Sequence, residues 1–95
     1  MLSQIPIDLA KVDKSQLDKE ILRAAIIAEL DAVSLYEQLA AMTEDKAIKE
    51  VLLDVAKEEK THAGEFQALL LRIDKQYEQE LDHGREEVEE LLGER

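Results

Sequence analysis

Apolar residues recur at alternating steps of three and four along two long stretches of the chain, which is the spacing of the buried face of an amphipathic helix. The first stretch runs from Ser15 to about Met42, and the second continues to about Asp74. Ser15 followed by Asp18 resembles a capping box, and Thr43 is placed to cap the second helix. The pattern therefore predicts two long helices joined by a short turn.

The flanking segments have weaker patterns. Residues 1–14 contain the only proline and show no sustained helical period, so they are predicted to form an N-terminal arm. Residues 15–75 form the predicted two-helix hairpin, and residues 76–95 are predicted to be a linker and a short C-terminal helix. Gly84 is expected to break the helical pattern and Gly93 to end it. With no strand alternation and no internal repeat, the predicted fold class is all-α, an antiparallel hairpin plus a short third helix.

Each long helix has an apolar seam that is interrupted by polar residues. The seams comprise Leu22, Ile26, Glu29, Val33, Tyr36 and Ala40 in the first helix, and Ile48, Leu52, Val55, Glu59, His62, Phe66, Leu69 and Ile73 in the second. The interruptions are Glu29, Glu59 and His62, and all three are residue types that bind iron. They are therefore the candidate metal ligands, and the remaining seam positions are the candidate core.

The three interruptions are expected to lie at one level of the hairpin. Glu29 and Glu59 are each 15 residues from Glu44, at the centre of the turn. At a rise of about 1.5 Å per residue, each lies about 22 Å from the turn, so antiparallel packing brings them together. Glu59 and His62 are three residues apart and share a helix face. The sequence therefore predicts that three side chains converge from two helices.

Energetics favours a metal among these side chains. Burying an ionised carboxylate without a partner costs several kcal/mol, and neither seam offers a Lys or Arg to neutralise Glu29 and Glu59. A divalent cation supplies the missing positive charge. The alternative is that Glu59 and His62 hydrogen-bond to each other across an interface, because an acidic helix often produces Glu-x-x-His by chance. Because Glu29 is expected at the same level of the hairpin as Glu59, the metal site is the favoured interpretation.

The ligand set amounts to half of a known type of site. A di-iron site in a four-helix bundle takes one Glu from each of two helices and a Glu-x-x-His from each of the other two. This chain supplies one Glu and one Glu-x-x-His at matched level, so a two-fold partner is expected to bring the rest. Carboxylates with one imidazole suit iron or manganese, with zinc or calcium as substitutes. Two Fe(II) ions held this way can each give one electron to O₂ and become Fe(III).

Length and composition limit the other possibilities. Two or three helices in 95 residues cannot enclose a sizeable core, so oligomerisation is expected. The absence of cysteine excludes disulfides, thiolate zinc sites, iron–sulfur clusters and a rubredoxin-type iron site. The net charge of −11 opposes nucleic-acid binding and leaves two interpretations open, a solubilising surface or one that concentrates cations. With no membrane-length apolar stretch and no signal-peptide pattern, the expected location is cytoplasmic.

The residues resemble those of a known family. LRAAIIAELDA at 22–32, followed by LYEQ at 35–38, is similar to the first helix of encapsulated ferritins. LLDVAKEEKTH at 52–62, with GEF at 64–66, is similar to their second helix. The resemblance covers roughly residues 20–92 and matches in order and spacing. It implies a protomer that dimerises to build a ferroxidase centre, with the dimers arranged in a ring, for which a decamer is the expected form.

The resemblance also implies residence in the lumen of an encapsulin nanocompartment, whose shell protein holds the iron mineral and is a partner of this chain. Fe(II) and O₂ are the implied substrates. The family's ligand positions are Glu29, Glu59 and His62; Tyr36 matches a tyrosine near the centre, and Asp31 and Glu58 match positions linked to metal approach. Ala28, Thr61 and Leu35 depart from residues in some relatives, which argues against an outer metal-attraction site. Residues 91–95 show no apolar cargo tail, so fusion to a shell protein, truncation or another route to the shell is expected.

Several alternatives stay open at this point. Tyr36 is either a core residue or a partner of the site, and Asp31 and Glu58 are either solvated charges or part of a metal entry route. His83 is expected on the surface of the linker. Two other functions are compatible with the residues. One is a peroxide-reducing di-iron protein, which the lack of cysteine disfavours, and the other is a non-catalytic helical assembly clamped by metal.

Overall fold

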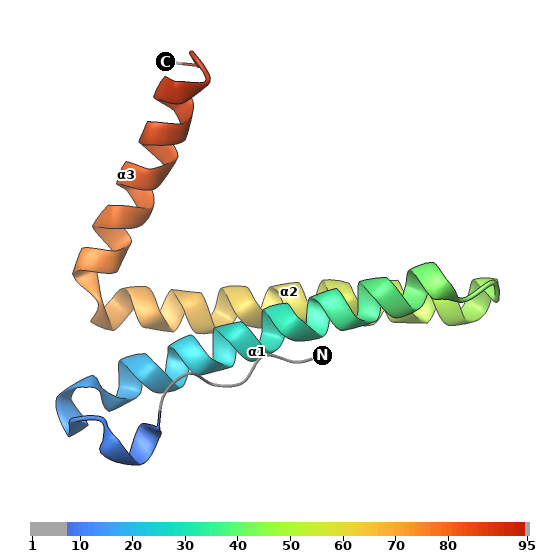
Figure 1. Cartoon of the computed structure of the whole chain (residues 1–95), viewed down its shortest axis with the longest axis horizontal. Helices are drawn as coiled ribbons and strands as arrows, with labels where there is room; N and C mark the ends of the chain where they lie inside the picture. Colours follow the sequence, from blue (N-terminus) through green and yellow to red (C-terminus); the bar gives the residue numbers. More distant parts are fainter. Residues whose placement is uncertain (1–7, 95) are drawn as a thin grey trace.

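The computed structural model describes residues 8–94 and is all-helical over that range. A short 3₁₀ helix, η1 (Leu9–Lys11), precedes three α-helices, which are α1 (Lys14–Met42), α2 (Lys46–Ile73) and α3 (Lys75–Leu91). α1 and α2 lie side by side and antiparallel, and α3 leaves the end of this hairpin at a steep angle (Figure 1). The predicted all-α hairpin is confirmed. Most of the predicted N-terminal arm, residues 1–7, lies outside the described residues.

The helix starts differ from the predicted ones by one or two residues. The residue that precedes α1 is Asp13, and Ser15 already lies inside the first turn, so the predicted Ser15 cap is wrong. The cap of α2 is Asp45, not Thr43: the Asp45 Oδ1 atom accepts a hydrogen bond from the Ile48 N–H at 2.9 Å. Thr43 instead stabilises the turn, because its Oγ1 accepts from the Asp45 N–H at 3.1 Å. An acidic residue of the turn, Asp45, therefore caps the start of α2.

Small side chains hold α1 and α2 together. The buried apolar residues are Val33 and Ala40 on α1, and Ala56, Ala63 and Leu70 on α2. Alanine at two of the three α2 positions lets the helix axes approach closely. On α2 these positions lie one residue after Val55, His62 and Leu69 of the predicted seam, so the stripe that packs within the chain is adjacent to the predicted one rather than identical to it.

The predicted seam of α2 is therefore partly uncovered at both of its ends. Ile48, Leu69 and Ile73 are 52%, 46% and 46% exposed, and Ile21 of α1, which lies near Leu69 and Ile73, is 46% exposed. Ile21, Leu69 and Ile73 line one shallow hollow near the end of the hairpin opposite the turn. We call the surface that carries these four residues the open face. An apolar stripe of this length on an isolated hairpin is typical of an interaction surface.

The C-terminal segment is one continuous helix, which corrects the expected break. α3 runs through Gly84 and includes His83, so no linker separates it from α2 beyond Asp74. Gly93 ends the segment as predicted, with φ of 70°. Its N–H donates to the Glu90 carbonyl at 3.1 Å and the Glu94 N–H donates to the Glu89 carbonyl at 2.8 Å, which together form a Schellman motif. One glycine in a helix interior lowers its stability without ending it.

The two glycines of α3 give a paired stability prediction. An added Cβ at Gly84 meets no atom within 4 Å, so Gly84→Ala is expected to stabilise the protein by about 0.5–1 kcal/mol. Gly93→Ala is expected to destabilise it by about 1–2 kcal/mol, because alanine resists positive φ. Urea unfolding followed by circular dichroism measures both changes. A lower midpoint for Gly84→Ala would contradict a continuous α3.

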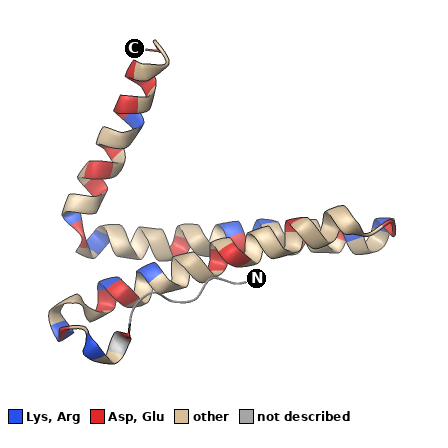
Figure 2. Ribbon diagram, viewed as in Figure 1, with Lys and Arg blue, Asp and Glu red and all other residues tan. Residues whose placement is uncertain are grey.

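Acidic residues are spread along α3 and lie in the middle of the hairpin (Figure 2). α3 alone carries seven acidic and two basic residues, which accounts for five of the eleven net negative charges. Across residues 8–94, no helix carries an apolar stretch long enough to span a membrane.

Candidate metal centre

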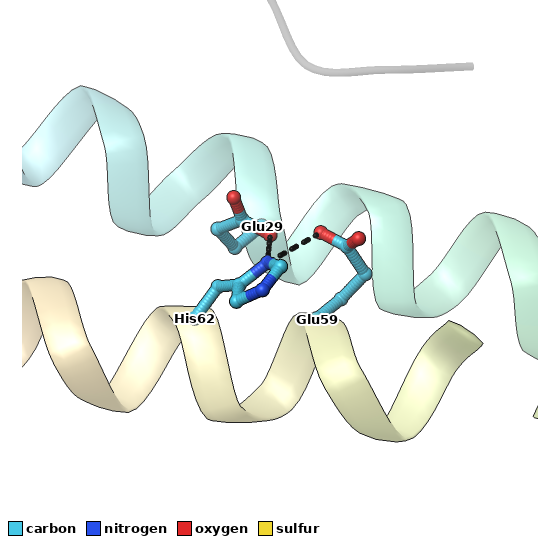
Figure 3. Close-up of side chains that lie close together, drawn as sticks. All are labelled: Glu29, Glu59 and His62. Carbon is cyan, nitrogen blue, oxygen red and sulfur yellow. Dashed lines mark ion pairs between the residues drawn. The ribbon is translucent and has the colours of Figure 1, made fainter. Parts of the chain in front are cut away.

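Three candidate ligands converge halfway along the hairpin. Glu29 comes from α1, and Glu59 and His62 come from α2 (Figure 3). The His62 Nδ1 atom lies 3.5 Å from Glu29 Oε2 and 3.6 Å from Glu59 Oε2. Within residues 8–94 this is the one group of three such side chains whose ligand atoms all lie within 4.8 Å of one another. The structure thus brings together the three side chains that the seam pattern selected.

Helix geometry explains the convergence. Glu59 is 13 residues from the first residue of α2 and 14 from the last, and Glu29 is similarly central in α1. Because the two helices are antiparallel, their midpoints lie at the same level. Glu59 and His62 share one face of α2 through their three-residue spacing. That face borders the open face, so the group is accessible from outside the chain.

The contacts within the group leave ligand atoms unused. Distances of 3.5 and 3.6 Å are too long for good hydrogen bonds. Glu29 Oε2 is buried and has no hydrogen-bond partner, although an unpartnered buried carboxylate oxygen costs more than 1 kcal/mol. The side chains of Glu29 and Glu59 are about one-fifth exposed and that of His62 is 46% exposed. Two carboxylates and an imidazole nitrogen around an unpartnered oxygen fit a divalent cation such as iron or manganese.

The electrostatics of the group point the same way. The Glu59 carboxyl, which can accept a hydrogen bond from protonated Glu29, raises the pKa of Glu29 above 4.5. Burial and repulsion by the Glu59 charge add to this rise, and His62 opposes it. Desolvation lowers the pKa of His62, but Glu29, Glu59 and the nearby Glu65 together raise it above 6.5. The metal-free site therefore holds protons that a cation would displace.

These shifts predict how the stability of the metal-free protein depends on pH. For both groups the raised pKa means that the folded protein holds the proton more tightly than the unfolded chain does. Their contribution to the free energy of unfolding is complete below the ordinary pKa values of 4.5 and 6.5, and it is lost as pH rises through the raised values. Urea unfolding in chelator across this range measures the trend. The Glu29→Gln/His62→Gln variant should show a weaker decline, and an equal decline in both proteins would contradict the prediction.

The other residues selected from the sequence lie outside this group. Tyr36 is half-buried one heptad after Glu29, Asp31 is half-buried on α1, and Glu58 is exposed on α2. Within the described part of the chain, no hydrogen bond joins Tyr36 to the three ligands. Sequence reasoning missed Glu65, whose charge acts on His62 and whose three-residue spacing from it was a visible signal.

Two further contacts involve residues like those of the site. Glu37 Oε2 and Lys60 Nζ form an ion pair of 3.0 Å between α1 and α2, next in sequence to Tyr36 and Glu59. Glu80 and His83 on α3 repeat the Glu-x-x-His spacing, and the Glu80 Oε2 and His83 Nδ1 atoms lie 3.3 Å apart. Both side chains of that second pair are about 60% exposed, and no third ligand joins them among the described residues. The spacing alone therefore does not identify a site; the addition of Glu29 does.

A helical hairpin with a Glu opposite a Glu-x-x-His defines the ferritin-like class of carboxylate proteins. Residues 20–92 match the family model described as Rubrerythrin, so the chain belongs to the rubrerythrin family. It is also similar to an encapsulated ferritin domain from Pyrococcus furiosus, whose crystal structure superposes with a TM-score of 0.83 at 50% identity, covering 98% of this chain and 95% of that one. The resemblance to encapsulated ferritins is thereby confirmed.

A second relative is a longer protein. Over 74 residues the chain is 61% identical to a protein of Pyrococcus furiosus named ferritin-like-encapsulin shell fusion protein. The aligned segment covers 78% of this chain and 21% of that relative. The chain thus spans about a fifth of the fusion protein's length.

Proposed function

We propose that two copies of this chain pair through the open face and form a ferroxidase that oxidises Fe(II) to Fe(III) with O₂. The observation that carries the proposal is the group formed by Glu29, Glu59 and His62, whose ligand atoms lie within 4.8 Å of one another. The group found within residues 8–94 comprises two carboxylates and one imidazole, which is half of what a two-metal site uses. A second copy related by a two-fold axis supplies the other half.

The shape of the open face supports this pairing. Ile48 lies towards the turn and Leu69 and Ile73 lie towards the opposite end, with Glu59 between them. A two-fold axis through the group of ligands places the turn end of one copy on the opposite end of the other. The exposed apolar residues of each copy then meet those of its partner over the whole length of α2. The product is a four-helix bundle with the ligands at its centre.

Each residue has a defined part in the proposed reaction. Iron is the substrate: each of two Fe(II) ions gives one electron to O₂, which takes up two protons as it is reduced. Glu29 and Glu59 bind and orient the ions through their carboxylates, and His62 binds through a ring nitrogen. Glu29 Oε2, which has no hydrogen-bond partner, would be available as a ligand to a bound cation. Protons held by Glu29 and His62 are displaced when iron enters.

The setting of the reaction is proposed from the relatives. One is named as a ferritin-like-encapsulin shell fusion and the other as an encapsulated ferritin domain. These names support a cytoplasmic iron store in which this chain works in the lumen of an encapsulin nanocompartment and delivers Fe(III) to a mineral held by the shell. A ring of dimers, as in a decamer, is the proposed assembly. Tyr36 is proposed to pack beside the centre, and Asp31 and Glu58 to lie along the route of metal approach.

Anaerobic loading with Fe(II), followed by O₂, tests the proposal. Rapid growth of Fe(III) absorbance, with one metal per chain found only in even-numbered assemblies by native mass spectrometry, is the expected result. Metal-dependent assembly without oxidation would instead support a clamp filled by zinc or calcium. Faster oxidation with peroxide than with O₂ would support a peroxide-reducing di-iron protein, the second candidate.

A further inference from the structure

α3 has few contacts that could fix its direction. Among the described residues it packs against α2 only, sparsely, and not against α1 (Figure 1). The junction is a single residue, Asp74, with φ of −126° and ψ of 85°, outside the helical region. A helix joined by one residue and packed only sparsely is free to swing unless the junction itself is held.

Asp74 is held by all three helices. Its side chain is among the most buried polar groups described, at 8% exposure for the residue. Its N–H donates to the Leu70 carbonyl at 2.9 Å and so completes α2. Its Oδ1 accepts from the Tyr77 N–H at 3.1 Å and so caps α3. Its Oδ2 accepts from Arg23 Nη2 of α1 at 3.1 Å. Asp74 thus joins the end of α2 through its backbone, and the start of α3 and the side of α1 through its carboxylate.

Arg23 is held from a second side. Its Nη1 donates to Glu20 Oε1 at 2.8 Å, so both arms of the guanidinium are engaged. Because the guanidinium is planar, its two arms cannot shift independently. The Arg23 side chain also lines a hollow with Ile27, Leu70 and Tyr77, which differs from the hollow on the open face. The Asp74 carboxylate caps the first turn of α3. The Arg23 side chain therefore fixes the orientation of that carboxylate, and of the turn it caps, relative to α1.

We propose that Arg23 is the positioning residue for α3: through Asp74 it sets the direction in which α3 leaves the hairpin. On this proposal α3 is a rigid extension rather than a swinging arm. Its direction can then be changed without altering Glu29, Glu59 or His62. The proposal stands on the fold and does not depend on ferroxidase activity.

Distances between two spin labels test the proposal directly, because the chain has no cysteine. Labels at Lys57→Cys on α2 and Glu87→Cys on α3, both exposed positions, report the angle between the helices. Labelled chains are mixed with an excess of unlabelled chains so that only distances within one chain are measured. We expect a single narrow distribution for this labelled chain and a distribution widened by about twofold or more when Arg23→Gln is added.

Two further variants keep the test specific. Asp74→Asn retains a capping oxygen for Tyr77 but removes the charge paired with Arg23, so it should broaden the distribution as Arg23→Gln does. The double variant should be no broader than either single one. Lys60→Gln, which removes the 3.0 Å ion pair with Glu37 within the hairpin, should leave the distribution narrow. A broad distribution in the parent, or a narrow one in both Arg23→Gln and Asp74→Asn with retained helicity, would overturn the proposal.

Discussion

Glu29→Ala and His62→Ala proteins are expected to lose more than ~100-fold of the Fe(II) oxidation rate while the helical hairpin stays folded. Loss of an outer partner of a metal ligand already costs about 10–100-fold, so loss of the ligand itself should cost more. For Glu29→Ala we also expect the metal-free protein to become more stable. The substitution removes a buried, unpartnered carboxylate oxygen and the repulsion from Glu59 that raises the Glu29 pKa.

The opposite effects on activity and stability distinguish a ligand from an ordinary structural residue. Fe(III) absorbance after O₂ addition gives the first quantity, and urea unfolding in chelator gives the second. Glu50→Ala is the control, because Glu50 is an exposed glutamate of the hairpin, on α2, outside the group of ligands. Glu50→Ala should change neither the rate of iron oxidation nor the free energy of unfolding by much. A Glu29→Ala protein that oxidises iron at the original rate would remove Glu29 from the site.

Leu69→Arg is expected to abolish both dimer formation and iron oxidation, although every ligand is intact. Leu69 is 46% exposed on the open face, so arginine is tolerated in the single chain. In the proposed dimer the charge is buried without a partner, which costs several kcal/mol, and the two-fold axis repeats it in each copy. We therefore expect the dimer to weaken by at least ~1,000-fold.

Native mass spectrometry and Fe(III) absorbance measure the two effects on the same sample. Leu53→Arg is the control, because Leu53 is equally exposed, at 47%, on the same helix but away from the ligands' stripe. That variant should remain dimeric and active. If Leu69→Arg were monomeric and still oxidised iron at the original rate, the shared site would be disproved, and each chain would have to carry a complete centre.

The hairpin and the convergence of its ligands were predictable because both follow from helical periodicity. Glu29 and Glu59 interrupt apolar stripes at equal distances from the turn, and a constant rise per residue turns that count into a position. The pattern could not tell which stripe packs within the chain. Ala56 and Ala63 do so because small residues allow close approach, whereas Ile48, Leu69 and Ile73 of the predicted seam stay exposed.

Features that depend on single contacts were not predictable. Gly84 carries a turn signal, but the surrounding residues sustain α3 through it. Thr43 and Asp45 are both good capping residues, and only the path of the turn selects Asp45. The tie between Arg23 and Asp74 joins residues 51 positions apart, so no local pattern indicates it. The unpartnered state of Glu29 Oε2 likewise appears only when side chains are placed.

The central position of Glu59 in α2 limits how the length of this hairpin can change. A turn of helix added at one end of a hairpin would overhang its proposed two-fold partner unless an equal length were added at the other end. Each addition must also keep the apolar stripes on the same faces of the helices, which requires steps of about seven residues. Insertions or deletions of one heptad should therefore be tolerated when they occur in pairs, one on each side of Glu59. A single insertion or deletion should be selected against.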